Sequence, residues 1–208
     1  MKEFDKKVDV LVVGTGCGGL TAALTASISG SAEVLVIEKN ELIGGTSATS
    51  GGVIWIPDNH HSRSLNIEDS QAEAKEYLKA TIPEEEFNEP LIDAYLAQGP
   101  EMVSFLEENT DVRYTILEHY PDYFQDAPGV KQGYRSLEPL PVSGATLGND
   151  VDNLHPSGPQ TIMFGRYGVN FQESHAFTTQ SPGWLFLFVK TFLTYWLDLP
   201  WRIKRKRS

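Results

Sequence analysis

The sequence predicts an α/β fold in which a parallel sheet is flanked by helices. Three observations carry this prediction. The apolar, β-branched run Val10–Val13 leads directly into a glycine-rich turn, as a buried strand does. Residues 20–29 after the turn are rich in alanine and predict a helix. A second β-branched run, Val34–Ile37, completes a strand–helix–strand unit, whose two strands lie parallel.

The turn between the first strand and the helix has the spacing G-x-G-x-x-G, on Gly14, Gly16 and Gly19. In this pattern the first glycine allows a sharp turn, the second lets the backbone approach a pyrophosphate, and the third lets the helix pack on the strand. The N-terminus of the helix then offers N–H groups and partial positive charge to the phosphates. We therefore expect a dinucleotide site, with an ordinary glycine turn as the alternative.

Glu38 stands at the end of the second strand, about 20 residues beyond the glycine turn. A carboxylate at this place accepts hydrogen bonds from the two hydroxyls of a ribose. It would also repel a 2′-phosphate, which argues against NADP as the dinucleotide.

A second loop, residues 44–52, is rich in glycine and hydroxyl groups. An NAD-dependent dehydrogenase does not require such a loop at this point. FAD does, because its flavin end extends past the pyrophosphate and needs further backbone N–H groups and hydroxyls along the ribityl chain and the ring. The loop therefore predicts FAD, and a flexible surface loop is the alternative.

Composition limits the partners of the 208-residue chain. Five of its 17 basic residues fall in the last seven positions, which leaves 12 basic against 28 acidic residues elsewhere. Such an acidic body excludes nucleic acid as an expected partner. The single Cys17 excludes an internal disulfide, and no signal peptide is visible, so we expect a cytoplasmic protein. We interpret Cys17 as a small residue that fits the turn, not as a redox centre.

Residues 69–109 predict three amphipathic helices with solvated acidic faces. The first runs to Thr81 with Asp69 as its N-cap, and Pro83 follows it. The second begins near the glutamates at 84–86 and is broken by Gly99-Pro100, and the third ends near Asn109. The apolar residues expected on the buried side of the second helix are Leu91, Ile92, Tyr95 and Leu96.

His60 and His61 are adjacent, in a polar segment that predicts a solvated loop. Neighbouring histidines point different ways in most backbones, and no third metal ligand lies near them in the sequence. We therefore predict no metal site.

The rest of the chain predicts a strand at residues 112–117, an aromatic turn at 119–124, and loops with short strands over 144–177. A helix over 183–199 would be about 25 Å long, shorter than the ~30 Å core of a bilayer, and Lys190 lies in its middle. We divide the chain into residues 1–181 and an aromatic, amphipathic segment with a basic tail, 182–208. We expect this segment to lie on a membrane surface at the inner face, or else to be a core helix covered by further chain.

The motifs GTGCGG, VIEKN and GGTSATSGGVIWIP together resemble the fumarate reductase/succinate dehydrogenase-type flavoproteins, and within them most closely the 3-ketosteroid dehydrogenases. The resemblance implies a Rossmann-like FAD-binding domain. Gly45 replaces the histidine that attaches FAD covalently in membrane fumarate reductases, so it implies non-covalent FAD. The cofactor contacts that it implies are Gly14, Gly16, Gly18, Gly19, Glu38, Lys39, Gly44, Gly45, Thr46, Ser47, Ser50, Gly51 and Gly52.

A further resemblance covers the Tyr-Pro-Asp-Tyr segment that ends at Tyr123 and the later stretch GYRSLEP. In the steroid enzymes the tyrosine that matches Tyr123 lines the steroid pocket beside the flavin and hydrogen-bonds the tyrosine that acts as base. The resemblance therefore implies a catalytic role for Tyr123. An aromatic surface turn that packs on the core is the alternative.

The function implied is the FAD-binding portion of an oxidoreductase that desaturates the A-ring of a 3-ketosteroid. A hydride would pass to the flavin and a proton to a tyrosine expected beyond Ser208, and an external acceptor such as a quinone would take the electrons. The matched motifs cover only the first part of such an enzyme, so we expect an incomplete domain, inactive by itself. The alternatives are a fumarate- or urocanate-reductase-like flavoprotein and a non-catalytic flavin-domain fragment.

Overall fold

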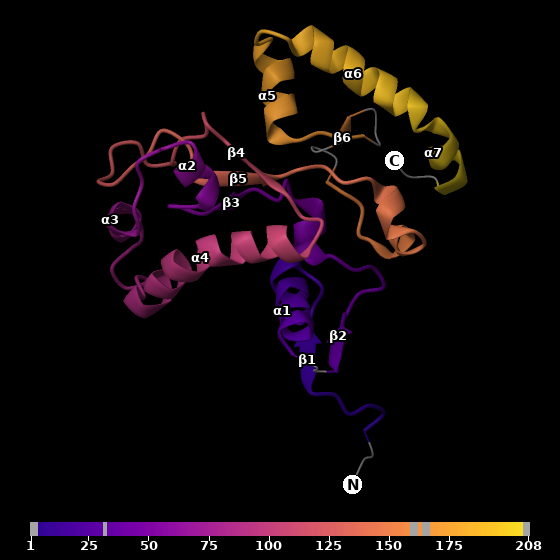
Figure 1. The fold of residues 1–208 in the computed structure, drawn as a ribbon, viewed down its shortest axis with the longest axis horizontal. Helices are drawn as coiled ribbons and strands as arrows, with labels where there is room; N and C mark the ends of the chain where they lie inside the picture. The colour runs from indigo at the N-terminus through magenta and orange to yellow at the C-terminus, as the bar shows by residue number, and fades with distance from the viewer. Residues whose placement is uncertain (1–3, 31–32, 159–161, 164–166, 206–208) are drawn as a thin grey trace. The chain divides into compact units, whose positions relative to one another are not determined.

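The structure is a computed structural model, which describes residues 4–30, 33–158, 162–163 and 167–205 (Figure 1). The chain divides into two compact units. The first comprises Met1–Gly51, Val142–Val169 and Glu173–Ser208, and the second comprises Gly52–Pro141 with Asn170–Gln172. Each unit is described by itself.

The first unit contains the predicted strand–helix–strand motif. Strands β1 (Val10–Val13) and β2 (Val34–Ile37) pair in parallel, and α1 (Cys17–Ser29) contacts both. A Cβ on Gly19 would lie 2.2 Å from the carbonyl oxygen of Gly14, so only glycine permits this approach of helix to turn. The predicted fold class, a parallel sheet with flanking helices, is confirmed.

Only one face of this two-stranded sheet is covered in the described structure. Val12 faces α1, since its side chain lies 3.5 Å from where a Cβ of Gly19 would stand. Leu11 and Val13, which alternate with it, are 56% and 75% exposed. Parallel sheets are normally buried on both faces, and this face has the apolar character of a buried one.

The second glycine loop is joined to a later segment of the same unit. The loop forms η1 (Gly45–Thr49), and the preceding Ile43 bridges Leu154 in parallel. Two 3₁₀ turns, η2 (Gly144–Leu147) and η3 (Asp150–Asn153), lead to this bridge.

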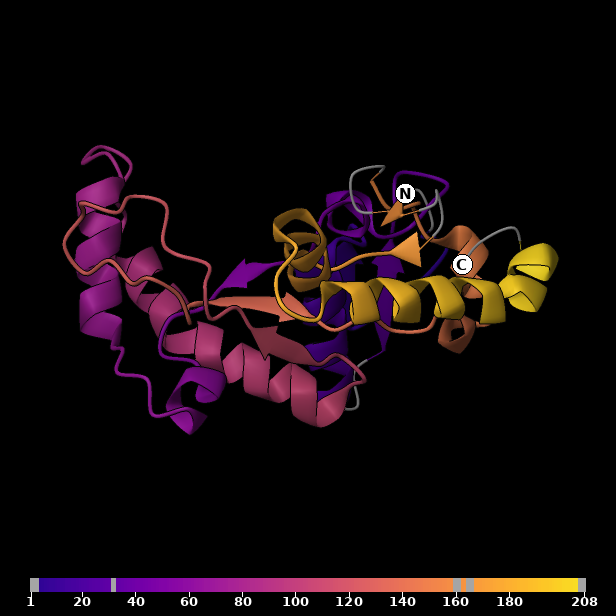
Figure 2. The same ribbon diagram turned by 90° about the horizontal axis from the view of Figure 1, so that it is seen from above.

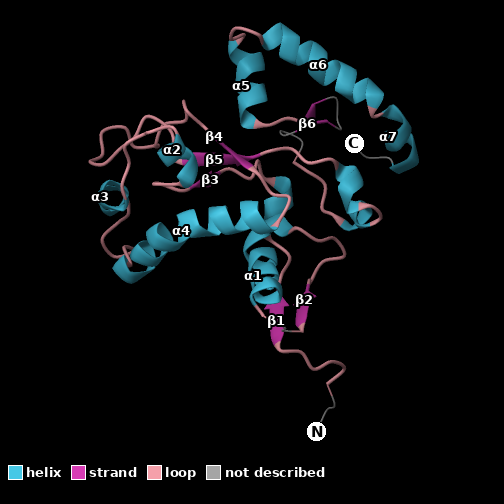
Figure 3. Ribbon diagram, in the orientation of Figure 1, coloured by secondary structure: helices cyan, strands magenta, loops and turns pink. Residues whose placement is uncertain are grey.

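The second unit is built on a three-stranded antiparallel sheet with the strand order β3-β5-β4. The strands are β3 (Ile54–Trp55), β4 (Tyr114–Ile116) and β5 (Ser136–Pro139), so the strand predicted over 112–117 is present. Figure 3 shows the long helix α4 (Glu89–Asn109) alongside these strands. Their shared core is formed by Ile56, Val103, Ile116 and Leu137.

Helix α4 corrects the prediction of a break at Gly99-Pro100, because the helix is continuous through both residues. Both lie on its buried face with Leu96 and Val103, and a Cβ on Gly99 would come within 3.3 Å of Ile56. Burial of this face therefore offsets the backbone hydrogen bond that a proline removes.

Two further predictions in this region were wrong. The glutamates at 84–86 form a turn, and α4 begins at Glu89 after Asn88, whose side chain accepts a hydrogen bond from Leu91 N–H. Leu91 and Tyr95 are exposed, whereas Leu96 is buried as expected. The acidic residues at 84–86 are exposed, as predicted.

Helix α3 (Gln71–Thr81) ends where it was expected to end, but its N-cap is Ser70. The Ser70 hydroxyl accepts a hydrogen bond from Glu73 N–H, as in a capping box. The predicted cap, Asp69, takes part instead in an ion pair with Arg135.

The C-terminal part contains a short antiparallel pair, β6 (Ile162–Met163) and β7 (Tyr167–Gly168), followed by α5 (Phe171–Thr179), a helix in a region predicted as loops and strands. The helix predicted over 183–199 is present as α6 (Trp184–Leu197), and α7 (Leu199–Arg205) follows it directly (Figure 2). Within the described residues, none of the helices has the length and apolar character needed to cross a bilayer.

Candidate functional site

Glu38 is fixed by four hydrogen bonds from the chain itself. Its Oε2 accepts from the N–H and the hydroxyl of Thr15, at 2.9 and 2.6 Å, and its Oε1 accepts from the N–H groups of Lys39 and Asn40, at 2.8 and 3.1 Å. The Thr15 hydroxyl and these N–H groups lower the pKa of the Glu38 carboxyl from 4.5 to about 2. The carboxylate at the end of β2 is therefore ionised and tied to the glycine turn.

Two hydroxyl groups join the two glycine loops. The Thr15 hydroxyl, which donates to Glu38, also accepts from Gly44 N–H at 2.8 Å, and Thr15 is only 6% exposed. The Ser47 hydroxyl accepts from Cys17 N–H, the first residue of α1, at 3.0 Å. Thr15 thus connects the Glu38 carboxylate with the second loop, a role that the sequence analysis did not assign.

The geometry around these loops suits a dinucleotide. Gly14 has φ +98°, and the first turn of α1 carries no acidic residue, so its partial positive charge is available to an anion. A Cβ on Gly45 would lie 3.6 Å from Gly16 Cα, which shows how closely the two glycine backbones approach. The predicted contacts that lie in this unit are Gly14, Gly16, Gly18, Gly19, Glu38, Lys39, Gly44, Gly45, Thr46, Ser47, Ser50 and Gly51.

The remaining predicted site residues, Gly52 and Tyr123, lie in the second unit. This unit contains a cavity of about 320 Å³ beside the aromatic turn. The cavity is lined by Val53, Trp55, Tyr77, Leu78, Thr81, Tyr120, Pro121, Asp122, Tyr123, Phe124 and Ser136. Its walls are mainly aromatic and aliphatic, as in sites for apolar small molecules.

Two tyrosines form a hydrogen-bonded pair at this cavity. The hydroxyl oxygens of Tyr120 and Tyr123 are 3.2 Å apart, and Tyr123 is 80% exposed. The hydrogen bond with Tyr123, together with burial, raises the pKa of Tyr120. Tyr120 also packs edge-on against Phe171, which restricts its ring.

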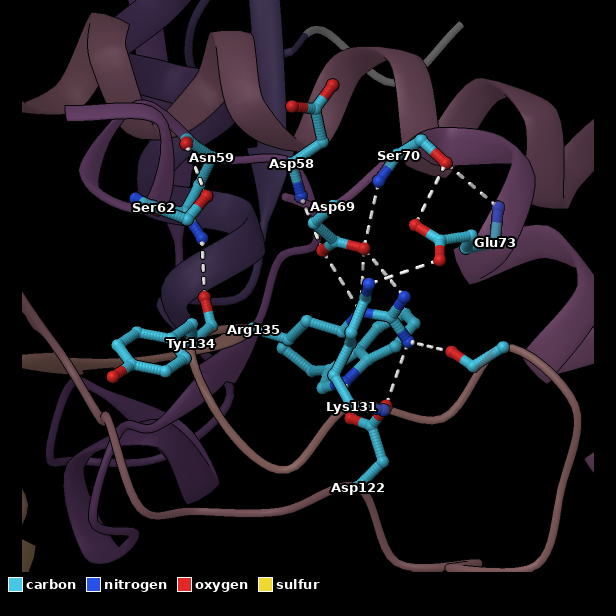
Figure 4. A network of polar contacts seen from close by, with 12 residues as sticks. Asp58, Asn59, Ser62, Asp69, Ser70, Glu73, Asp122, Lys131, Tyr134 and Arg135 are labelled. Atoms are coloured by element: carbon cyan, nitrogen blue, oxygen red, sulfur yellow. Dashed lines mark hydrogen bonds and ion pairs between the residues drawn. The ribbon is translucent and has the colours of Figure 1, made fainter. Parts of the chain in front are cut away.

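Asp122, one of the residues that line the cavity, belongs to a buried ionic cluster (Figure 4). Arg135, only 1% exposed, donates from Nε and Nη2 to Asp69 and from Nη1 to Asp122 at 2.8 Å. Burial alone would lower the pKa of Arg135, but the hydrogen bonds and charges of the two aspartates outweigh it and raise the pKa. The guanidinium also lies 5.5 Å from the ring centroid of Trp55, whose Nε1–H donates to Asp122 at 2.6 Å.

This cluster fixes the residues that line the cavity. Asp122 immediately precedes Tyr123. One oxygen of its carboxylate accepts from Trp55 and the other accepts from Arg135. The sequence analysis quoted Arg135 only as part of a motif, because nothing local reveals partners 66 and 13 residues away.

His60 and His61 do not form the solvated loop that was predicted. They begin the short helix α2 (His60–Ser64), with ring centroids 4.2 Å apart. Both rings approach the carboxylate of Glu107 on α4, which is 46 residues away in the sequence from His61. The prediction of a loop was wrong because both histidines lie in α2, where their rings meet a carboxylate from a distant helix.

Residues 9–173 match the family model described as FAD binding domain. The chain belongs to this family. It is 42% identical over 160 residues to a 4-oxocyclohexanecarboxylate 2-dehydrogenase of Sinomonas cyclohexanicum, which covers 76% of this chain and 28% of the relative. It is 40% identical over 153 residues to a 3-oxosteroid 1-dehydrogenase of Mycobacterium tuberculosis, which covers 73% and 27%.

A solved structure of 3-ketosteroid delta1-dehydrogenase from Sterolibacterium denitrificans, in complex with 1,4-androstadiene-3,17-dione, superposes with a TM-score of 0.88. The two sequences are 40% identical, and the superposed region covers 96% of this chain and 35% of the solved chain. These comparisons confirm the predicted resemblance and FAD as the cofactor. The chain spans only about a quarter to a third of the relatives it matches.

We expect Thr15→Val to raise the pKa of Glu38 from about 2 toward 4.5, because the largest contribution to the lowering is the Thr15 hydroxyl. A folded-state pKa below the unfolded value means that Glu38 stabilises the fold above about pH 4.5, and that this contribution is lost as the pH falls to about 2. In the variant, this contribution should be lost over a narrower range of pH. Carboxyl ¹³C NMR titration measures the change, with Thr25→Val as the control because its hydroxyl bonds only within α1. Identical Glu38 titrations in both variants would contradict this role of the Thr15 hydroxyl.

We expect Arg135→Met to lower the free energy of unfolding by roughly 3–5 kcal/mol, because it leaves two buried carboxylates without their counter-charge. Arg63→Met is the control: its side chain is 57% exposed and 3.9 Å from Asp58, so its loss should cost less than about 1 kcal/mol. Urea unfolding followed by circular dichroism measures both. Equal, small losses would show that the cluster does not hold the cavity wall together.

Proposed function

We propose that this chain provides the FAD-binding part and one wall of the substrate pocket of a 3-oxosteroid dehydrogenase. The observation that carries the proposal is the apolar cavity with its paired tyrosines, in a chain that belongs to the FAD-binding family. The relatives named 3-oxosteroid 1-dehydrogenase support the same substrate class.

The residues of the first unit would hold the cofactor in an extended arrangement. Glu38 would accept hydrogen bonds from the ribose, and Gly14 and Gly16 would face the pyrophosphate at the N-terminus of α1. Gly45 offers no side chain for a covalent bond, so attachment would be non-covalent. Bound FAD supplies the acceptor for a hydride from the substrate.

Tyr123 would serve as the hydroxyl that supports proton removal. Its oxygen is hydrogen-bonded to Tyr120 and its side chain is 80% exposed, so it can meet a further group of a complete enzyme. A hydrogen bond donated by the Tyr123 hydroxyl to the tyrosine base expected in the complete enzyme would stabilise the phenolate of that base. In an enzyme that contains this chain, Tyr123→Phe should keep the flavin content and slow steroid dehydrogenation.

A small oxo acid is the second candidate substrate, because another relative is named 4-oxocyclohexanecarboxylate 2-dehydrogenase. The charges at the cavity favour the steroid. Its described lining residues include no Lys or Arg, and they do include Asp122. A substrate carboxylate would meet like charge there, whereas a neutral steroid would not.

The probe for the substrate is 1,4-androstadiene-3,17-dione, added to the 208-residue chain while tryptophan fluorescence is measured. We expect saturable quenching, because Trp55 lines the cavity. Trp55→Phe should remove most of it, and Trp184→Phe, on α6 in the first unit, should not. Stronger binding of 4-oxocyclohexanecarboxylate than of the steroid would favour the small-acid alternative and reject this proposal.

We assign the C-terminal segment, residues 182–208, to a membrane surface. There the flavin could pass electrons to an acceptor such as a quinone. The segment exposes large apolar side chains, with Phe186 77% and Leu197 81% exposed, and its sequence ends in basic residues. Each Lys or Arg near an anionic leaflet contributes about 1 kcal/mol. The division at residue 181 remains a prediction.

The full chain should co-sediment with anionic liposomes at low salt and be released at high salt. A chain that ends at Ser181 is the matched control and should stay in the supernatant. If the full chain also stays in the supernatant at low salt, α6 is a helix that other protein covers.

A further inference from the structure

We propose that His60, His61 and Glu107 form a binding site for a first-row transition-metal dication, with Zn²⁺ as the probe. The His60 Nε2 lies 2.8 Å from Glu107 Oε2, and the His61 Nε2 lies 3.2 Å from Glu107 Oε1. The ligand atoms of all three residues lie within 4.8 Å of one another. Two imidazole nitrogens and one carboxylate are a donor set that zinc accepts, with a fourth position left for water.

The backbone that carries the two histidines is fixed by Asn59. This residue is fully buried and caps α2 by accepting a hydrogen bond from Ser62 N–H at 3.0 Å. Its side-chain N–H groups donate to the carbonyls of Ile56 and Tyr134, so α2 is anchored to the core. Consecutive histidines in this first turn then place both rings on the side that faces α4.

The carboxylate on α4 is held in place independently of the histidines. Glu107 Oε1 accepts from Tyr114 N–H at 2.7 Å, and the side chain is 14% exposed. The backbone of β4 therefore positions the carboxylate that the two histidine rings approach.

An outer partner orients one of the imidazoles. The His60 Nδ1 lies 3.2 Å from the Ser104 hydroxyl, which stands one turn before Glu107 on the same face of α4. A hydrogen bond on the second ring nitrogen fixes the ring of a metal-binding histidine and leaves Nε2 for the metal. The site thus has an outer contact as well as its three ligands.

The test is titration of the chelator-stripped 208-residue chain with Zn²⁺ in competition with a chromogenic chelator. We expect one Zn²⁺ per chain, and affinity at least about tenfold weaker in His60→Gln, His61→Gln and Glu107→Gln. Ser104→Ala should weaken binding by about tenfold through loss of the outer contact. His119→Gln, a histidine of the same unit outside the cluster, is the matched control and should bind as the wild type does.

Histidine ¹⁵N NMR separates metal binding from a purely structural role of these residues. Zn²⁺ should shift the Nε2 signals of His60 and His61 and leave those of His119 unchanged. If the wild type binds Zn²⁺ no more tightly than the three ligand variants do, the proposal is overturned and only a histidine–glutamate ion pair is left. Shifts confined to other histidines would overturn it equally.

Discussion

The second unit depends on the burial of one guanidinium. Arg135 on the approach to β5 satisfies Asp69 before α3, Asp122 in the aromatic turn and the carbonyl of Gly129. A buried charge with these partners tolerates no large movement of any of them, because each released carboxylate would remain uncompensated in the interior. The aromatic turn therefore has a fixed place although it contains no regular secondary structure.

The first unit uses neutral hydroxyls for the same purpose. Thr15 and Ser47 each bridge a glycine loop to a neighbouring segment, and glycine alone would leave both loops with greater conformational freedom. Loops that are already joined lose less conformational entropy when a cofactor binds to them. Thr15 therefore prepares the site although its own side chain is almost fully buried.

Local patterns in the sequence were sufficient to predict the structure where it is decided by residues close to one another along the chain. Spacing within the first 52 residues predicts the β1–α1–β2 unit, the place of Glu38 at the end of its second strand, and FAD as the cofactor. Interactions between distant residues were not visible: Pro100 stays helical because its face is buried, and Asp69 is drawn from a cap into an ion pair. His60 and His61 meet Glu107 for the same reason. What could not be predicted in these three cases was a tertiary partner.

The ionic cluster also determines which charge is available beside the cavity. Arg135 lies 5.5 Å from the ring centroid of Trp55, yet its guanidinium nitrogens already donate to two aspartates and a backbone carbonyl. A substrate carboxylate could recruit it only by displacing one of those aspartates into the interior, at a cost of several kcal/mol. The same interactions that fix Asp122 and Trp55 therefore hold the guanidinium away from the cavity. The unit is stabilised by a buried cation that is already committed to its own partners.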